Sequence, residues 1–139
     1  MRIAAMIAAA AMVGMAANEE LSDPKVTAAI LRAWEQTRNG LSRNEAGFRL
    51  DARRAGYEIV EVASTNQFSA QSLPIIPGVT FALFHVHPSQ ADPAPSEKDR
   101  MIADQFSIRI FTIHALGVFV YDPGTRKTLK LRNGTGWMR

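Results

Sequence analysis

The sequence predicts a single α+β domain in which a mixed, mainly antiparallel sheet is flanked by helices. Two observations support this prediction. A helical pattern near the start gives way to period-two or short apolar runs bounded by turn residues, in the order helix, three strands, helix and further strands. The length of 139 residues with 47% hydrophobic composition suits one compact core and leaves little room for a second domain. The expected domain covers residues 18–139.

The segment 1–17 has the layout of a secretory signal peptide. Arg2 precedes a run of about fifteen apolar residues, and small residues come just before the acidic pair Glu19 and Glu20. A membrane-spanning helix needs roughly 20 apolar residues, so we expect cleavage near Ala16 or Ala17 and no membrane span afterwards. The protein would then be exported to the periplasm or secreted. If the segment is an alanine-rich helix packed on the domain, or follows a start codon assigned too early, the protein would be cytoplasmic.

The first helix is predicted from Pro24, which suits the first helical position. Ser22 or Asp23 would cap it, and Gly40 stands where a left-handed residue commonly ends a helix. Four apolar residues at helical spacing are predicted to face the core: Val26, Ile30, Leu31 and Trp34.

The remaining elements follow from alternation and turn residues. Residues 46–53 and 57–64 are predicted to form a hairpin, and 79–87 a central strand buried on both faces because its first part is almost continuously apolar. A short helix is expected over 96–107. Three closing strands are expected over 109–116, 117–123 and 128–133, with a turn at 122–124.

Charge and cysteine content restrict the chemistry. The net charge is only +3, and the basic residues Arg126, Lys127, Lys130 and Arg132 have no aromatic residues interleaved with them. We therefore expect a solvated face there and no nucleic-acid partner. The chain contains no cysteine, which excludes disulfides and thiolate metal sites, so a metal ion must be bound by histidine and carboxylate.

Two of the three histidines, His85 and His87, alternate at the end of the central strand. Their side chains should project to the same side, roughly 6 to 7 Å apart along the strand. Pro88 ends the strand, and the following loop and helix start could bring Asp99 back as a third ligand. Two histidines and one carboxylate leave a fourth position for water, as in catalytic zinc sites. The alternatives are half-buried polar residues at a strand end, and an ordinary helix cap formed by Ser96 and Asp99.

The pattern His85-x-His87-Pro88 followed by Ser96-x-x-Asp99 resembles the JAMM signature of the JAB/MPN metallopeptidases, in particular their bacterial JAB and RadC-like branch. The later segment 110–125 is also similar to a strand, turn and strand of that family. The resemblance implies a JAB/MPN-like (cytidine-deaminase-like) fold, a Zn²⁺ ion held by His85, His87 and Asp99, and cleavage of a peptide or isopeptide bond.

The resemblance also implies roles for residues that do not bind the metal. Glu45, in the stretch 43–48, would be the general base, and Ser96 would hydrogen-bond the attacking water or the oxyanion. Glu58 and Glu61 on the next predicted strand are substitute candidates for the base, although solvated strand positions are the expected role of both. Gly47 follows Glu45 by two residues where the family has three. The eight residues between His87 and Ser96 are one more than usual in the family. His114 is expected to have a structural or surface role.

Other functions remain open from the sequence. A catalytically inactive JAB/MPN-like binding or scaffold module would keep the fold without hydrolysis. Non-haem Fe(II) oxygenases also use two histidines and one carboxylate, but usually on a jelly-roll fold with a distant second histidine. Export would favour envelope peptides, peptidoglycan stems or an exported antagonist as partners over a ubiquitin-like substrate.

The first prediction concerns export. If residues 1–17 are a cleaved leader, native protein should begin near Asn18, and intact-mass analysis of the protein purified from its own cells checks this. An intact Met1 in the cytosolic fraction would contradict the prediction and leave the domain unaffected.

Overall fold

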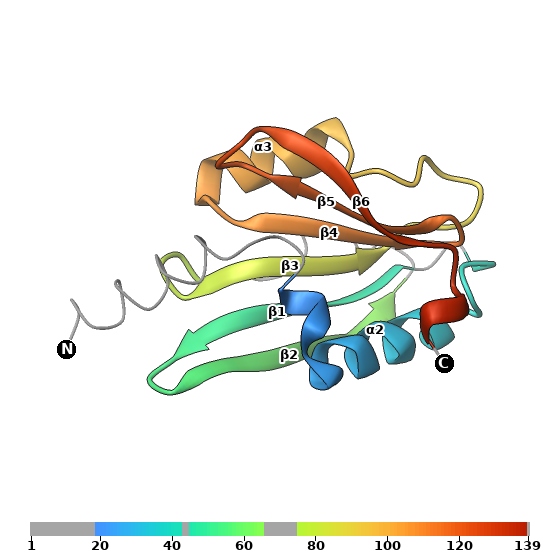
Figure 1. The fold of residues 1–139 in the computed structure, drawn as a ribbon, viewed down its shortest axis with the longest axis horizontal. Helices are drawn as coiled ribbons and strands as arrows, with labels where there is room; N and C mark the ends of the chain where they lie inside the picture. Colours follow the sequence, from blue (N-terminus) through green and yellow to red (C-terminus); the bar gives the residue numbers. More distant parts are fainter. Residues whose placement is uncertain (1–18, 43–44, 66–74, 139) are drawn as a thin grey trace.

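The computed structural model describes residues 19–42, 45–65 and 75–138, and it is an α+β domain (Figure 1). The predicted leader 1–17 lies outside the described residues. Two helices, α2 (Pro24–Gln36) and α3 (Glu97–Phe106), accompany a six-stranded sheet, and short 3-10 helices cover Glu20–Ser22 and Gly136–Met138. The strands are β1 (Glu45–Arg53), β2 (Gly56–Thr65), β3 (Thr80–Val86), β4 (Arg109–His114), β5 (Gly117–Asp122) and β6 (Lys127–Asn133).

The sheet is mixed, with the strand order β2-β1-β3-β4-β5-β6. Only β3 and β4 pair in parallel among the described strands, and the connection between them contains α3. The other four pairings are antiparallel. The prediction of an α+β domain with a mainly antiparallel sheet is therefore confirmed.

The two helices cover opposite faces of the sheet. Successive residues of a strand point to opposite sides, and neighbouring residues of β3 pack against different helices. On β3, Phe84 belongs to the core cluster that includes Ile30 of α2. Its neighbour Leu83 belongs to the cluster that includes Ile102 of α3. Every residue of β3 is buried, as expected for a central strand.

Aromatic stacking makes the centre of the sheet rigid. The ring centroids of Phe48 and Phe84 lie 4.5 Å apart, and those of Phe84 and Phe111 lie 4.1 Å apart, with nearly parallel planes in both pairs. The stack runs across β1, β3 and β4. The stack lies on the α2 face, opposite to the face of His85, so the backbone that carries this histidine belongs to a well-packed part of the fold.

Helix α2 begins as predicted but ends earlier. Asp23 caps it by accepting a hydrogen bond from the Lys25 backbone N–H at 2.8 Å. The predicted core residues Val26, Ile30 and Trp34 are buried, whereas Leu31 is only half-buried. The helix ends at Gln36 because three successive residues, 38 to 40, have left-handed backbone conformations.

Gly40 is required at this corner by a close approach. A Cβ atom there would lie 2.6 Å from the Trp34 ring and 2.8 Å from the Ser89 hydroxyl, and φ is +78°. The Gly40 carbonyl also accepts a hydrogen bond from the Ser89 backbone N–H at 2.8 Å. The corner after α2 therefore supports the loop that follows His87.

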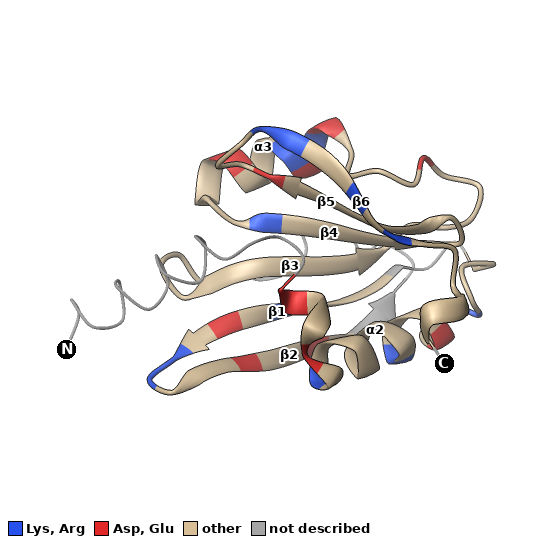
Figure 2. Cartoon of the chain, in the orientation of Figure 1, with Lys and Arg blue, Asp and Glu red and all other residues tan. Residues whose placement is uncertain are grey.

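The basic cluster predicted to be solvated lies on and beside the edge strand β6 (Figure 2). Arg126, Lys127 and Lys130 are exposed. Charged side chains on an edge strand discourage pairing with the edges of other sheets. Among the described residues, no helix is both long and apolar enough to cross a bilayer.

One ion pair is buried within the apolar core. Arg109 of β4 is fully buried, and its guanidinium Nη2 lies 2.5 Å from Glu20 Oε1. Glu20 itself is only 2% exposed and belongs to the short 3-10 helix that precedes α2. The pair therefore connects the start of the described chain to the middle of the sheet.

Substituting Glu20→Ala should lower the free energy of unfolding by about 3 kcal/mol, because it removes a carboxylate beside a buried guanidinium. Urea unfolding followed by circular dichroism measures the change. The matched control is Glu19→Ala, the exposed neighbour, which should change stability by less than about 0.5 kcal/mol. Equal effects of the two substitutions would show that the buried pair does not stabilise the fold.

Candidate metal centre

The two histidines of the His-x-His pattern lie at the end of β3. His85 lies within the strand, and His87 follows its last residue. The His87 backbone N–H donates to the Ile113 carbonyl at 2.9 Å, so the contact with β4 continues past the end of the strand. The two residues are 2% and 7% exposed, respectively. Their rings stand at right angles with centroids 4.7 Å apart, so the histidines share one side of the sheet as predicted.

The acidic member of the group comes from the first turn of α3. Ser96 and Asp99 form a capping box, in which the Asp99 backbone N–H donates to Ser96 Oγ at 3.1 Å and the Ser96 backbone N–H donates to Asp99 Oδ2 at 2.9 Å. The reciprocal bonds fix the Asp99 carboxylate at the helix start, where its negative charge is also favoured. Asp99 is 4% exposed.

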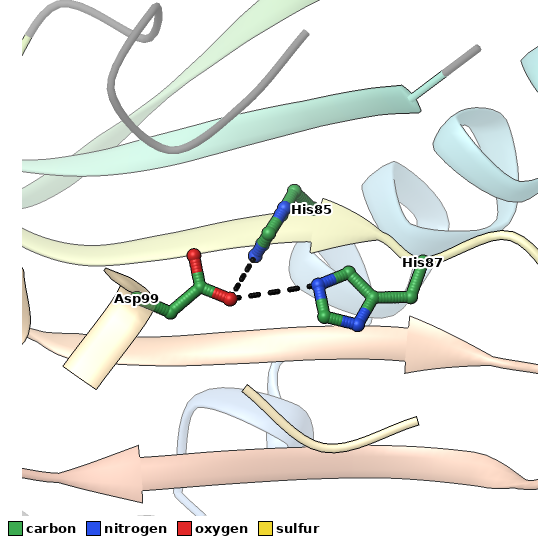
Figure 3. A group of neighbouring side chains, drawn as sticks. All are labelled: His85, His87 and Asp99. Atoms are coloured by element: carbon green, nitrogen blue, oxygen red, sulfur yellow. Dashed lines mark ion pairs between the residues drawn. The ribbon is translucent and has the colours of Figure 1, made fainter. Parts of the chain in front are cut away.

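The three side chains converge on one point (Figure 3). Asp99 Oδ2 lies 3.3 Å from His85 Nε2 and 3.5 Å from His87 Nε2. Among the described residues, these three form the one group whose ligand atoms all lie within 4.8 Å of one another. Tetrahedral zinc with bonds of about 2.0–2.2 Å separates its ligand atoms by about 3.3–3.6 Å. The two distances from Asp99 to the imidazole nitrogens fall in this range, so this buried group could bind a metal ion.

Electrostatics keep the carboxylate ionised. Burial acts to raise the pKa of Asp99, but the interactions with His85 and His87 outweigh burial, and the net result is a pKa below the ordinary range. An ionised carboxylate is the form that ligates metal ions.

The other nitrogen of His87 has a backbone partner. His87 Nδ1 lies 2.8 Å from the Asp92 carbonyl oxygen. A carbonyl only accepts hydrogen bonds, so Nδ1 carries the proton and, in the neutral ring, Nε2 carries a lone pair on the side of Asp99. Metal-binding histidines commonly have this arrangement, with the second nitrogen donating to a carbonyl or carboxylate.

The structure places Ser96 at the N-cap of α3, with an exposed side chain. The sequence predicted a metal ligand or a helix cap at Asp99, two roles that one segment can combine. The carboxylate forms the cap while it also faces the two imidazoles.

The side chain of Glu45 lies outside the described residues, but the backbone does position the residue. Glu45 is the first residue of β1, and Gly47 of this strand lies opposite His85 of β3. The substitute bases are occupied elsewhere: Glu58 forms an ion pair with Arg53, and Glu61 forms one with Arg32.

Sequence reasoning did not identify the surroundings of the loop 88–95. Thr112 and His114 of β4 are buried, and each hydrogen-bonds a carbonyl of this loop. His114 is not a member of the ligand group, which agrees with the expected structural role. These two residues could have been identified only from the parallel register of β3 and β4, in which Thr112 is opposite His85.

No protein-family model, curated protein or solved structure matches the chain.

Wild-type protein should bind one zinc ion per chain, because the group offers three converging ligand atoms of types that zinc accepts. His85→Ala and Asp99→Ala should each lose most of this zinc, measured by metal analysis after dialysis at neutral pH. Zinc affinity should also fall as the pH is lowered, because protons compete with the metal ion for the imidazole nitrogens.

The matched control is Glu97→Ala, an exposed acidic residue in the same helical turn, which should retain full zinc content. Wild-type protein that purifies without metal and takes up no zinc would contradict the assignment of this site.

Proposed function

We propose that this protein is a zinc-dependent hydrolase of the JAB/MPN type that cleaves a peptide or isopeptide bond. The observation that carries the proposal is the convergence of two imidazole nitrogens and one carboxylate oxygen in a buried site built from a strand, a loop and a helix cap. The same strand, loop and cap carry the residues that resemble the JAMM signature.

The donor set fits zinc. When His87 is neutral, its Nε2 lone pair faces the ionised Asp99 carboxylate, and a zinc ion bound between them would be attracted to both. When bound, zinc would lower the pKa of a water ligand to about 7 and polarise a carbonyl group. With three protein ligands, one coordination position stays available for chemistry.

The proposed general base is Glu45. Gly47 of β1 is opposite His85 of β3, and Glu45 precedes Gly47 by two residues. Because the two strands are antiparallel, Glu45 lies toward the end of the sheet at which His87 follows β3. This register supports the requirement that a base from a distant part of the sequence reach the site. Glu45 would accept a proton from the nucleophilic water and return it to the leaving amine.

The proposed role of Ser96 is to donate a hydrogen bond to the developing oxyanion. Its oxygen already accepts from the Asp99 backbone N–H, which fixes the position of the hydroxyl. A hydroxyl group keeps one proton to donate, and the side chain is exposed, so a substrate can reach it. One such donor contributes about 3 kcal/mol when its geometry is right.

Glu45→Gln should retain zinc, because no ligand is lost, while the rate of hydrolysis falls by about 10²–10⁴-fold. Because the sequence of the substrate is unknown, the assay uses a degenerate peptide library together with lysine-linked isopeptides, and mass spectrometry detects cleavage. Metal analysis of the same samples gives the zinc content.

The control variants are Glu58→Gln and Glu61→Gln, whose carboxylates form ion pairs with arginines, and both should keep wild-type rates. A large loss in either control with full activity in Glu45→Gln would reassign the base. Zinc binding without any cleavage by wild-type protein would overturn the hydrolase and favour a JAB/MPN-like binding module.

A further inference from the structure

The loop 88–95 is held by three side chains that bind three successive carbonyl groups. His114 lies 3.1 Å from the Ala91 carbonyl oxygen through Nε2, and the Thr112 hydroxyl lies 2.6 Å from the Pro93 carbonyl oxygen. Between them, the Asp92 carbonyl accepts from His87 Nδ1 at 2.8 Å. The carbonyl that binds His87 is therefore fixed on both sides.

The direction of each of these bonds is determined. The Leu116 backbone N–H donates to His114 Nδ1 at 3.0 Å, so Nδ1 carries no proton and Nε2–H must donate to the loop. The Thr112 hydroxyl likewise donates, because its partner is a carbonyl. Both residues are buried at 0% and 3% exposure, so water does not compete strongly for these bonds.

The position of the Asp92 carbonyl decides what His87 can do. While Nδ1–H donates to this carbonyl, the neutral ring has its Nε2 lone pair on the side of Asp99. If the loop shifted, the Nδ1 proton would lose its acceptor, and the tautomer with the proton on Nε2 would become competitive. A proton on Nε2 blocks the atom that a metal ion needs.

We propose that Thr112 and His114 are positioning residues for this metal centre, which hold the loop so that the Asp92 carbonyl keeps His87 in its metal-binding tautomer. This inference rests on the proposed metal site and extends it to two residues that contribute no ligand. It also explains how a loop of eight residues between His87 and Ser96 is held in one conformation.

The test is Thr112→Val, which replaces the hydroxyl by a methyl group at similar volume. The zinc dissociation constant, measured by competition with a chelator, should rise by about 10-fold. This is the lower end of the loss in affinity that is typical when a hydrogen-bond partner of a metal ligand is removed. In metal-free protein, imidazole ¹⁵N spectra should show His87 moving from the Nδ1–H toward the Nε2–H tautomer. The chain has only three histidines, which makes assignment straightforward.

Thr112→Ser should restore both readouts, because it keeps the hydroxyl. Thr128→Val is the matched control, since it makes the same change on the exposed strand β6, and it should leave both readouts unchanged. His114→Gln, which loses the bond from Leu116, should shift both readouts in the same direction as Thr112→Val. This variant decides the question if Thr112→Val does not fold.

A lower melting temperature for Thr112→Val and His114→Gln, with unchanged zinc affinity and an unchanged His87 tautomer, would overturn the inference and leave these residues a purely structural role. If wild-type protein takes up no zinc, the metal site itself is wrong. The ¹⁵N spectra alone then decide whether Thr112 and His114 control the His87 ring.

Discussion

The parallel pairing of β3 with β4 is the constraint on which the rest of this site depends. Parallel neighbours cannot be joined by a tight turn, so the chain must leave the end of β3 and cross over before it enters β4. The crossover here consists of the loop 88–95 and α3. It brings the first turn of α3 back over the end of β3, and Asp99 thus meets the two histidines that precede it by about a dozen residues in the sequence.

The same pairing supplies the surroundings of the ligands. In the parallel register Thr112 is opposite His85. His114 follows Thr112 by two residues on β4, and it hydrogen-bonds the loop that leaves His87. The loop is therefore fixed by the strand next to the one it leaves. If β3 and β4 were joined as a hairpin, no long loop would follow His87. If β3 were an edge strand, no neighbouring strand would supply the side chains that hold this loop.

Local patterns predicted most of the fold. The cap and proline at 23–24 marked the start of α2, and alternation and turn residues located the strands. The end of α2 was placed too late, because the left-handed conformations begin before Gly40, at Arg38 and Asn39, and arginine seldom adopts such a conformation. His85, His87 and Asp99 were predictable because their convergence depends on strand alternation and a short return.

The remaining features required long-range register, which no local pattern contains. β1 lies beside β3 with Gly47 opposite His85, and these two residues are too far apart in sequence for a local pattern to align them. The roles of Thr112 and His114 depend in the same way on how β4 is aligned with β3. The buried pair of Glu20 and Arg109 joins residues almost ninety positions apart and has no sequence signature.

The capping box of α3 has a consequence for local opening of the protein. The oxygen of Asp99 that accepts from the Ser96 N–H is also the oxygen nearest to both imidazoles. Fraying of the first helical turn therefore breaks the cap and separates the acidic group from the histidines in a single event. An ion that binds only the closed form lowers the population of the frayed form by mass action. Amide hydrogen exchange at the start of α3 would then report on ion occupancy, although the amides themselves bind no ion.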